Sequence, residues 1–149
     1  MIVKSSTIRN HALSGRVDLA SVLLGENYSF SGQIVEGRGY GVKIGFPTAN
    51  IIPKDAGKII PASGVYGGWI ELEKERKDAV ITIGPRPTFD LKEEIIEIHI
   101  PDFEGVLYGK VLRVGFVRKL RNIEKFESQL ALIKQIKNDI ENFITNPKV

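Results

Sequence analysis

Hydrophobic and polar positions change their spacing twice along the chain of 149 residues. From Tyr28 onward, short β-rich runs alternate with Gly, Pro and Asp, which is typical of strands joined by turns. The runs predict strands near 28–36, 48–52, 64–73, 78–83, 94–100 and 106–118.

The fifth run has the clearest strand pattern. Ile96, Ile98 and Ile100 alternate with Glu97 and His99, which is the period of a half-buried strand. Glu97 and His99 therefore share the polar side. On pattern alone, a solvated surface position is expected for both of them.

Two regions have helical spacing. Apolar residues from Phe126 to Ile144 predict one amphipathic helix from about 123 to 144. Residues 1–25 predict two short helices. The expected N-caps are Ser6 or Thr7 for the first helix and Asp18 for the second, and the expected ends are Gly15 and Gly25. Leu19, Val22 and Leu23 would share a face of the second.

Several short strands followed by one helix indicate a mainly β fold, a small antiparallel barrel with a helix on its outside. The expected boundary lies near Gly25, which separates a helical arm, 1–25, from a barrel domain, 26–149. Apolar residues form 42 % of the chain, there are no cysteines, and no apolar run is long enough to span a membrane. A cytoplasmic protein is expected.

The glycine-rich segment from Gly37 to Asn50 is the first candidate for chemistry. Its glycines allow backbone N–H groups to surround a phosphate, and Lys43 adds a positive charge. It is neither a P-loop nor a dinucleotide fingerprint, because the required spacing is absent. A glycine-rich hairpin without a ligand remains the alternative.

Thr48 and Asn50 follow this segment on an expected strand. Side chains two residues apart point to the same face, so their two oxygen atoms can act together. Mg²⁺ prefers oxygen ligands and often completes its shell with phosphates and water. The alternative is an ordinary β position for Thr48 and a turn at Asn50.

RNA binding is a further alternative that the residues do not favour. Arg38-Gly39-Tyr40-Gly41 fits the start of an RNA-recognition signature, but the following positions lack the required aromatic residues. The net charge of +3 is a mild excess that does not call for nucleic acid.

A set of motifs in order resembles the riboflavin kinase family. They begin at Gly45, Gly64, Ile83, Glu97, Leu107 and Leu120, and read Gly-Phe-Pro-Thr-Ala-Asn-Ile, Gly-Val-Tyr, Ile-Gly-Pro-Arg-Pro-Thr-Phe, Glu-Ile-His-Ile-Pro-Asp-Phe, Leu-Tyr-Gly and Leu-Arg. The resemblance spans about residues 28–143. It implies a six-stranded antiparallel Greek-key barrel with a C-terminal helix, and transfer of the ATP γ-phosphoryl group to the terminal ribityl hydroxyl of riboflavin, giving FMN.

The resemblance also implies the roles of individual residues. Glu97 would be the general base, and Thr48 and Asn50 would ligate Mg²⁺ or another divalent cation. The implied nucleotide-binding residues are Gly37, Lys43, Gly45, Pro47, Thr48, Ile100, Asp102 and Tyr108. Arg121 and Phe126 would lie on the flavin side. A flavin- or nucleotide-binding module without catalysis is the alternative, because residues 122–124 and Thr82 depart from the family pattern.

The N-terminal segment adds a second resemblance. Lys4-Ser5-Ser6-Thr7-Ile8-Arg9 is similar to the end of the adenylyltransferase half of bacterial bifunctional FAD synthetases, and residues 1–25 resemble their connector. The His-x-Gly-His motif of that half does not occur in this sequence. The resemblance implies the kinase half, with an adenylyltransferase domain as a partner in a longer chain. No nucleic acid or membrane partner is expected.

Overall fold

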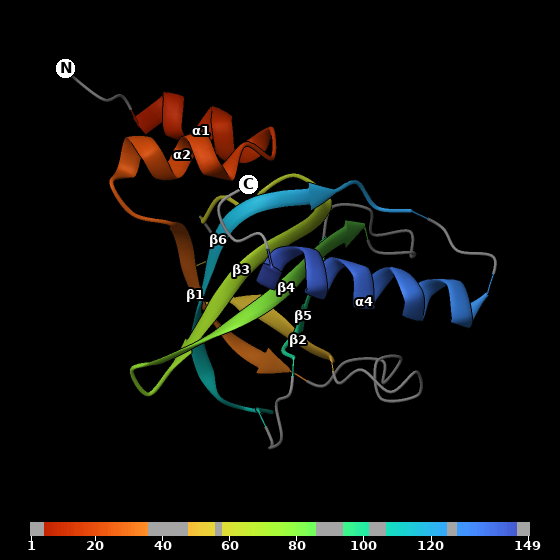
Figure 1. Ribbon diagram of the computed structural model, residues 1–149. Coiled ribbons are helices and arrows are strands. Elements are labelled where there is room, and N and C mark those ends of the chain that lie inside the picture. Colours follow the sequence, from red (N-terminus) through yellow and green to blue (C-terminus); the bar gives the residue numbers. More distant parts are fainter. Residues whose placement is uncertain are drawn as a thin grey trace.

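The computed structural model describes residues 5–35, 48–55, 58–85, 94–101, 107–124 and 128–145. Six strands form a closed barrel in the order β1-β2-β5-β4-β3-β6, and all neighbouring strands are antiparallel. Helix α4 lies on the outside of the barrel, and helices α1 and α2 lie at one end of it (Figure 1). The predicted fold class is confirmed.

The strands are β1 (Tyr28–Val35), β2 (Thr48–Pro53), β3 (Gly64–Leu72), β4 (Glu75–Pro85), β5 (Glu94–His99) and β6 (Val111–Arg121). The predicted sixth strand, 106–118, was placed too early. Residues 108–110 form a turn in which Gly109 has a φ of 81°, so the strand begins only after it and continues to Arg121.

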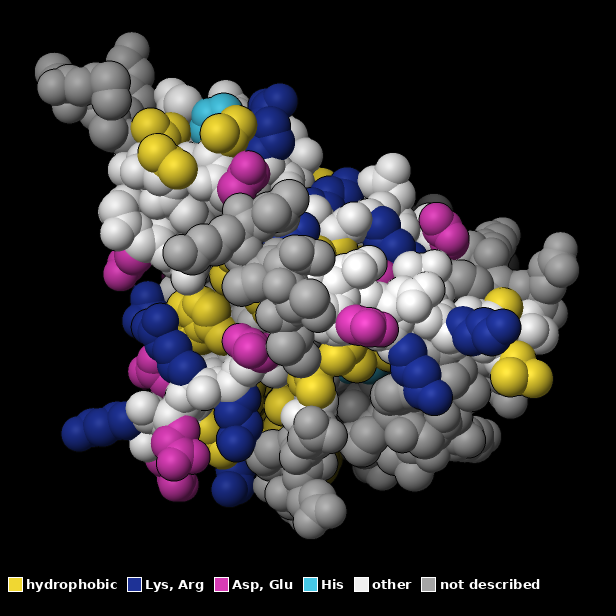
Figure 2. All heavy atoms as spheres, viewed as in Figure 1, with side chains coloured by type: hydrophobic (Ala, Val, Ile, Leu, Met, Phe, Trp, Pro, Cys, Tyr) yellow, Lys and Arg dark blue, Asp and Glu magenta, His cyan; other side chains and the backbone are white. Residues whose placement is uncertain are grey.

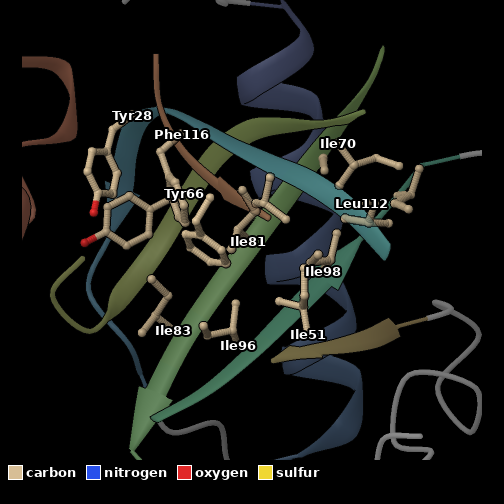
Figure 3. Packing of buried hydrophobic residues seen from close by; sticks show 14 of the residues in the cluster. Tyr28, Ile51, Tyr66, Ile70, Ile81, Ile83, Ile96, Ile98, Leu112 and Phe116 are labelled. Atoms are coloured by element: carbon tan, nitrogen blue, oxygen red, sulfur yellow. The ribbon is translucent and has the colours of Figure 1, made fainter. Parts of the chain in front are cut away.

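The barrel interior is filled with apolar side chains (Figure 3). The ring of Phe116 meets the Tyr66 ring edge-on at 5.4 Å between centroids and the Phe30 ring at 5.8 Å. Ile96 and Ile98 of β5 point into this core, as their alternation predicted. Aromatic contacts of this kind favour one packing arrangement over others and leave a filled core.

The C-terminal helix α4 (Gln129–Thr145) starts later than the predicted residue 123. Its start is set by Ser128, whose Oγ accepts a hydrogen bond of 3.2 Å from the Ala131 N–H, as an N-cap does. Ile136 and Phe143 are buried on its barrel side, whereas Leu130 is exposed. The predicted apolar stripe is therefore confirmed at Ile136 and Phe143 and wrong at Leu130.

The helical arm consists of α1 (Ser5–Leu13) and α2 (Val17–Leu24), and α2 packs on β1 and β6. Both predicted ends are confirmed: Gly15 has φ +80° after α1, and Gly25 is the left-handed C-cap of α2.

The predicted caps of the arm are wrong. Ser6 and Thr7 lie inside α1, and Asp18 lies in the first turn of α2, whose N-cap position is Arg16. Val17 and Ala20 form the buried face of α2. Leu19 and Val22 are exposed.

None of the helices within the described ranges is long and apolar enough to cross a membrane.

Helix α4 packs on the outer wall of the barrel at a position that carries no side chain. The ring of Phe143 lies on Gly67 of β3, where a Cβ would come within 2.2 Å of the ring. Val65 and Val80 also point outward, yet each is only 2 % exposed because α4 lies on β3 and β4. The glycine therefore sets how closely the helix approaches the sheet.

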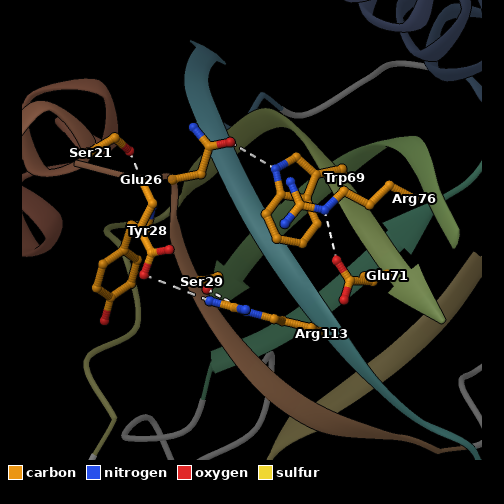
Figure 4. A network of polar contacts seen from close by, with 9 residues as sticks. Ser21, Glu26, Tyr28, Ser29, Trp69, Glu71, Arg76 and Arg113 are labelled. Carbon is orange, nitrogen blue, oxygen red and sulfur yellow. Dashed lines mark hydrogen bonds and ion pairs between the residues drawn. The ribbon is translucent and has the colours of Figure 1, made fainter. Parts of the chain in front are cut away.

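A separate polar network covers the outer face of β1, β6 and β3 on another part of the wall (Figure 4). Trp69 lies over Gly115, its Nε1 donates to Asn27 Oδ1 at 2.9 Å, and the Arg76 guanidinium stacks 3.9 Å from its ring centroid. Arg113 Nε donates to Ser29 Oγ at 2.8 Å. These contacts close the β3–β6–β1 side of the barrel and leave α4 to cover the β3–β4–β5 side.

Gly67→Ala is expected to destabilise the protein, because the new methyl group would overlap the Phe143 ring. Overpacking of this kind costs about 1–3 kcal/mol. The measurement is the free energy of unfolding by urea. In a Phe143→Leu background the same substitution should cost clearly less, since the two positions share one space.

Gly84→Ala on β4 is the matched control, because its Cβ would meet only Ile123 Cδ1, at 3.7 Å, an ordinary contact. Its unfolding free energy should stay close to that of the wild type. Equal losses at Gly67 and Gly84 would contradict the seating of α4 on Gly67.

Candidate functional site

The cross-strand register places several predicted site residues in one line around the barrel. Glu97 on β5 is the direct partner of Asn50 on β2 and of Thr82 on β4. Thr82 in turn pairs with Val65 of β3, and Val65 with Arg121 at the end of β6. We call the line Arg121–Val65–Thr82–Glu97–Asn50 the Glu97 row.

The Glu97 row lies on the outside of the barrel. Its inward neighbours Ile98 and Ile81 belong to the core, and residues next to each other in a strand point to opposite faces. Directly opposed residues of antiparallel strands have Cβ atoms about 4.5–5.5 Å apart. The carboxylate of Glu97 and the amide of Asn50 are thus neighbours on the same surface, and both residues are half-buried.

This pair of oxygen-bearing side chains fits a magnesium ion that arrives with a nucleotide. No cluster of three or more His, Cys, Asp or Glu residues suited to a metal occurs among the described residues. A fully protein-built cage is therefore not part of the described surface, whereas Mg²⁺ commonly uses few protein ligands together with phosphate oxygens and water. Asn50 carries a neutral amide oxygen of the kind that such an ion accepts as a ligand. The structure describes the backbone of Thr48 but not its side chain.

The predicted nucleotide residues Ile100 and Tyr108 lie toward one end of the barrel. Ile100 directly follows β5 and is buried in the core cluster. Tyr108 is 63 % exposed in the turn before β6, and the next residue, Gly109, donates its N–H to Ile34 O near the end of β1. Val35, which ends β1, pairs with Asn50, so the turn and the Glu97 row meet at this end.

The remaining predicted residues lie outside the described residues. They are Gly37, Lys43, Gly45 and Pro47 of the glycine-rich segment, together with Asp102 and Phe126. Their roles, like those of Thr48, Asn50, Glu97, Ile100, Tyr108 and Arg121, stay predictions.

Arg121 forms a buried ion pair with Asp139 of α4. Its Nε lies 3.0 and 3.1 Å from the two carboxylate oxygens, and its Nη2 lies 2.8 Å from Oδ2. Nη1 donates to the Asn122 carbonyl oxygen, and Gln135 donates to Asp139 Oδ1 at 3.0 Å. Removing one partner of such a pair costs about 3–5 kcal/mol, because the other charge stays buried.

A second line of paired residues runs beside the Glu97 row, and α4 packs on the two strands, β3 and β4, that carry its first members. We call it the His99 row: Gly67, Val80, His99 and Thr48, which the register joins across β3, β4, β5 and β2. The expectation that His99 is an ordinary surface residue is wrong, because it is only 7 % exposed. Its strand alternation is as predicted, but the position is covered.

Burial lowers the pKa of His99 from 6.5 to about 4, and the Asp139 carboxylate opposes this shift without overcoming it. His99 is therefore neutral near pH 7. Its Nδ1 is buried and has no hydrogen-bond partner among the described atoms.

Two residues of this region escaped the sequence reasoning. Asp139 is one of them, although its position held a signal: it lies three residues after Ile136 and four before Phe143, on the buried stripe of the helix. A carboxylate in such a stripe needs a buried cation. His99 held no such signal, since its cover comes from a helix that is distant in sequence.

A hollow of about 320 Å³ lies elsewhere, on the outer face of β1 and β6. It is lined by Ser29, Phe30, Ser31, Lys54, Asp55, Lys58 and Arg113. None of these residues belongs to the Glu97 row or to the predicted site residues. We therefore place the candidate site at the Glu97 row.

Comparison with known families identifies the family of this chain. A sequence model described as flavokinase, riboflavin kinase, matches residues 24–145, which is most of the chain. The chain belongs to the riboflavin kinase family.

Curated members of the riboflavin kinase family are similar over nearly the whole chain. The bifunctional riboflavin kinase/FMN adenylyltransferase of Bacillus subtilis is 35 % identical over 145 residues, which cover 95 % of this chain and 46 % of that protein. The protein of the same name from Haemophilus influenzae is 36 % identical over 140 residues, covering 93 % and 45 %. The chain spans about half the length of these relatives.

Solved structures show the same fold. A crystal structure described as a macrolide-efflux protein from Streptococcus pneumoniae has a TM-score of 0.89 at 35 % identity, covering 94 % of this chain and 46 % of that one. Riboflavin kinase from Trypanosoma brucei has a TM-score of 0.55 at 25 % identity, covering 80 % of both chains. The barrel is thus shared within the riboflavin kinase family.

Acid should weaken the fold through His99. The unfolded chain binds a proton at His99 below pH 6.5, whereas the folded protein keeps it neutral down to about pH 4. The stability that a neutral His99 supports is present above pH 6.5 and is lost as the pH falls toward 4, by up to about 1.4 kcal/mol per pH unit. Urea unfolding at several pH values measures this slope.

His99→Gln, which cannot titrate, should show a shallower slope between pH 6.5 and 4. If His99→Gln and the wild type lose stability in parallel, burial of a neutral His99 is not the cause.

Proposed function

We propose that the chain transfers the γ-phosphoryl group of ATP to the terminal ribityl hydroxyl of riboflavin and releases FMN and ADP. The observation that carries this proposal is the direct pairing of Glu97 with Asn50 on the outer wall of the barrel. A base and a metal ligand side by side are the two groups that a phosphoryl transfer to an alcohol needs most.

In the proposed reaction, Glu97 accepts the proton of the hydroxyl as its oxygen attacks the γ-phosphorus in line. The new O–P bond forms while the bond from the γ-phosphorus to the bridging oxygen of ADP breaks. Asn50, together with Thr48, would hold Mg²⁺, which supplies charge neutralisation on the phosphates when bound. Glu97 needs no neighbouring histidine, since a carboxylate within hydrogen-bond reach can take the proton.

The two substrates would approach the row from different sides. The nucleotide lies at the barrel end that holds Ile100 and Tyr108, with Gly37, Lys43, Gly45, Pro47 and Asp102 around its phosphates and base. The flavin lies toward Arg121 and Phe126. The order of residues in the Glu97 row supports this division, because Asn50 and Arg121 stand at opposite ends with Glu97 between them.

The described residues on one face of the protein do not favour a long anionic ligand. On the face shown in Figure 2, Lys and Arg alternate with Asp and Glu among the coloured residues and do not form one basic patch. A nucleic-acid surface usually shows a basic stripe or patch.

We further propose residues 1–25 as a connector to an adenylyltransferase domain, residues 26–149 as the kinase domain, and a cytoplasmic location.

Glu97→Gln is expected to lower kcat by roughly 10²- to 10⁴-fold, the usual contribution of a general base. The amide keeps the size of the side chain, so the fold should persist. The assay is conversion of riboflavin to FMN with ATP and Mg²⁺, with the product identified by mass. Circular dichroism and urea unfolding check the folded state.

Glu75→Gln, an exposed carboxylate on β4, is the control and should keep full activity. Wild-type protein that forms no FMN with any nucleoside triphosphate would overturn the kinase proposal in favour of a binding module. Full activity in Glu97→Gln would instead remove only the assigned base.

Asn50→Ala is expected to raise the Mg²⁺ concentration for half-maximal activity by roughly 10- to 100-fold, since a lost contact to a charged group is worth about 1.5–3 kcal/mol. Titration of activity with Mg²⁺ measures it. Ile52→Ala is the control on the same outward face of β2, two residues away. An unchanged Mg²⁺ requirement in Asn50→Ala would exclude Asn50 as a ligand.

A further inference from the structure

The guanidinium of Arg121 is engaged by other groups of the protein. Three of its guanidinium nitrogens make hydrogen bonds to protein oxygens: Nε and Nη2 donate to the Asp139 carboxylate, and Nη1 donates to the Asn122 carbonyl. The side chain is 17 % exposed, and that of Asp139 is 5 % exposed. A guanidinium held in this way is a poor candidate for direct recognition of a ligand.

The place of this ion pair is more informative than its energy. A buried ion pair is often no more stabilising than apolar residues of the same size. This pair, however, joins the last residue of β6 to the middle of α4, between Ile136 and Phe143, which are buried against the barrel. It therefore fixes the helix both along and across the outer wall.

The ion pair also connects the two rows on the outer wall. Arg121 ends the Glu97 row, whereas α4 covers the His99 row through Phe143 on Gly67. The Asp139 carboxylate also acts electrostatically on His99, which is on the same strand and face as Glu97, two residues away. The Arg121–Asp139 pair thus links β6 to α4 at the end of the Glu97 row.

Any acceptor whose hydroxyl reaches Glu97 must lie on the open side of this row or against the helix that borders it. A shift of α4 by about 1 Å would therefore move one wall of the acceptor site, and misplacement of that size can cost 10²-fold in rate. The helix position is set by the Gly67–Phe143 contact on one side and by the Arg121–Asp139 pair on the other.

We propose that Arg121 serves the flavin side indirectly, as a positioning residue that acts through Asp139 on α4. The inference rests on the proposed kinase function and deepens it. It replaces a direct contact between Arg121 and the flavin with control over the place of the helix that borders the acceptor site.

The deciding experiment exchanges the ion pair for apolar residues of similar size. Arg121→Met and Asp139→Leu are made singly and together, and KM for riboflavin, KM for ATP and kcat are measured on the full chain. Each single substitution removes one partner of the ion pair and leaves the charge of the other without it, which should move α4 and raise KM for riboflavin by roughly 10- to 100-fold. KM for ATP should change little.

The double variant should recover. With both charges gone, Met and Leu can pack between α4 and β6, so KM for riboflavin should return to within a few-fold of the wild type. If Arg121 instead bound the flavin itself, the double variant would keep a KM for riboflavin roughly 10-fold or more above that of the wild type, and the proposal would be overturned. This result does not depend on the single variants, so it decides the question even where one of them fails to fold.

Arg76→Met, which removes an exposed cation at the β3–β4 hairpin, is the matched control and should leave all three constants unchanged. Phe143→Leu tests loss of helix packing without loss of the ion pair. If it raises KM for riboflavin as much as Asp139→Leu does, general looseness of α4 explains the effect and the specific role of the pair is rejected.

Riboflavin binding is also measured by quenching of its fluorescence, without ATP. If the wild type forms no FMN, the kinase proposal fails, and the pattern of single loss and double recovery in binding alone still supports or rejects the positioning role. Absence of that pattern in a wild type that forms FMN rejects the positioning role and leaves the kinase proposal intact.

Discussion

The register of β5 between β2 and β4 is the constraint on which the candidate site depends. Because side chains alternate between the faces of a strand, a slip of one residue would turn Glu97 into the core and Ile98 outward. The inward Ile96 and Ile98, packed with Ile81, make that slip costly. The same apolar contacts that close the barrel therefore hold Glu97 opposite Asn50. The geometry of the proposed site therefore depends on the same strand pairing as the packing of the core.

The spacing of apolar residues and glycines was enough to predict features that depend on neighbouring residues in the chain. The alternation in β5 predicted which residues face the core, and Gly15 and Gly25 predicted the helix ends in the arm. The start of α4 was missed because periodicity extends through Phe126, whereas the helix begins at the Ser128 cap. The pairing of Glu97 with Asn50 could be inferred only through the family resemblance, since the two residues are far apart in sequence and no local pattern records which strands become neighbours.

The burial of His99 shows why contacts between elements that are distant in sequence could not be predicted. A polar residue on the outward face of a strand normally meets water. Here the outward face is covered by α4, and the cover depends on Gly67, Asp139 and Arg121, which come from three other elements. A strand between two apolar layers would show no alternation. The alternation in β5 correctly predicted that one face of the strand is apolar and the other polar. It did not indicate whether the polar face is exposed to solvent.

A six-stranded barrel of this kind has no room for a substrate inside, because small barrels are filled by their own side chains. Phe116, Tyr66 and Phe30 occupy that space here. Chemistry must therefore lie on the outer wall, and a single curved wall cannot enclose a substrate. The helix supplies a second wall, and its distance from the first is set by a glycine at Gly67 and by an ion pair at Arg121. The proposed positioning role of Arg121 would make the C-terminal helix part of the site, as the strand that carries Glu97 is, and its polar contacts with the barrel would then adjust the affinity for the acceptor.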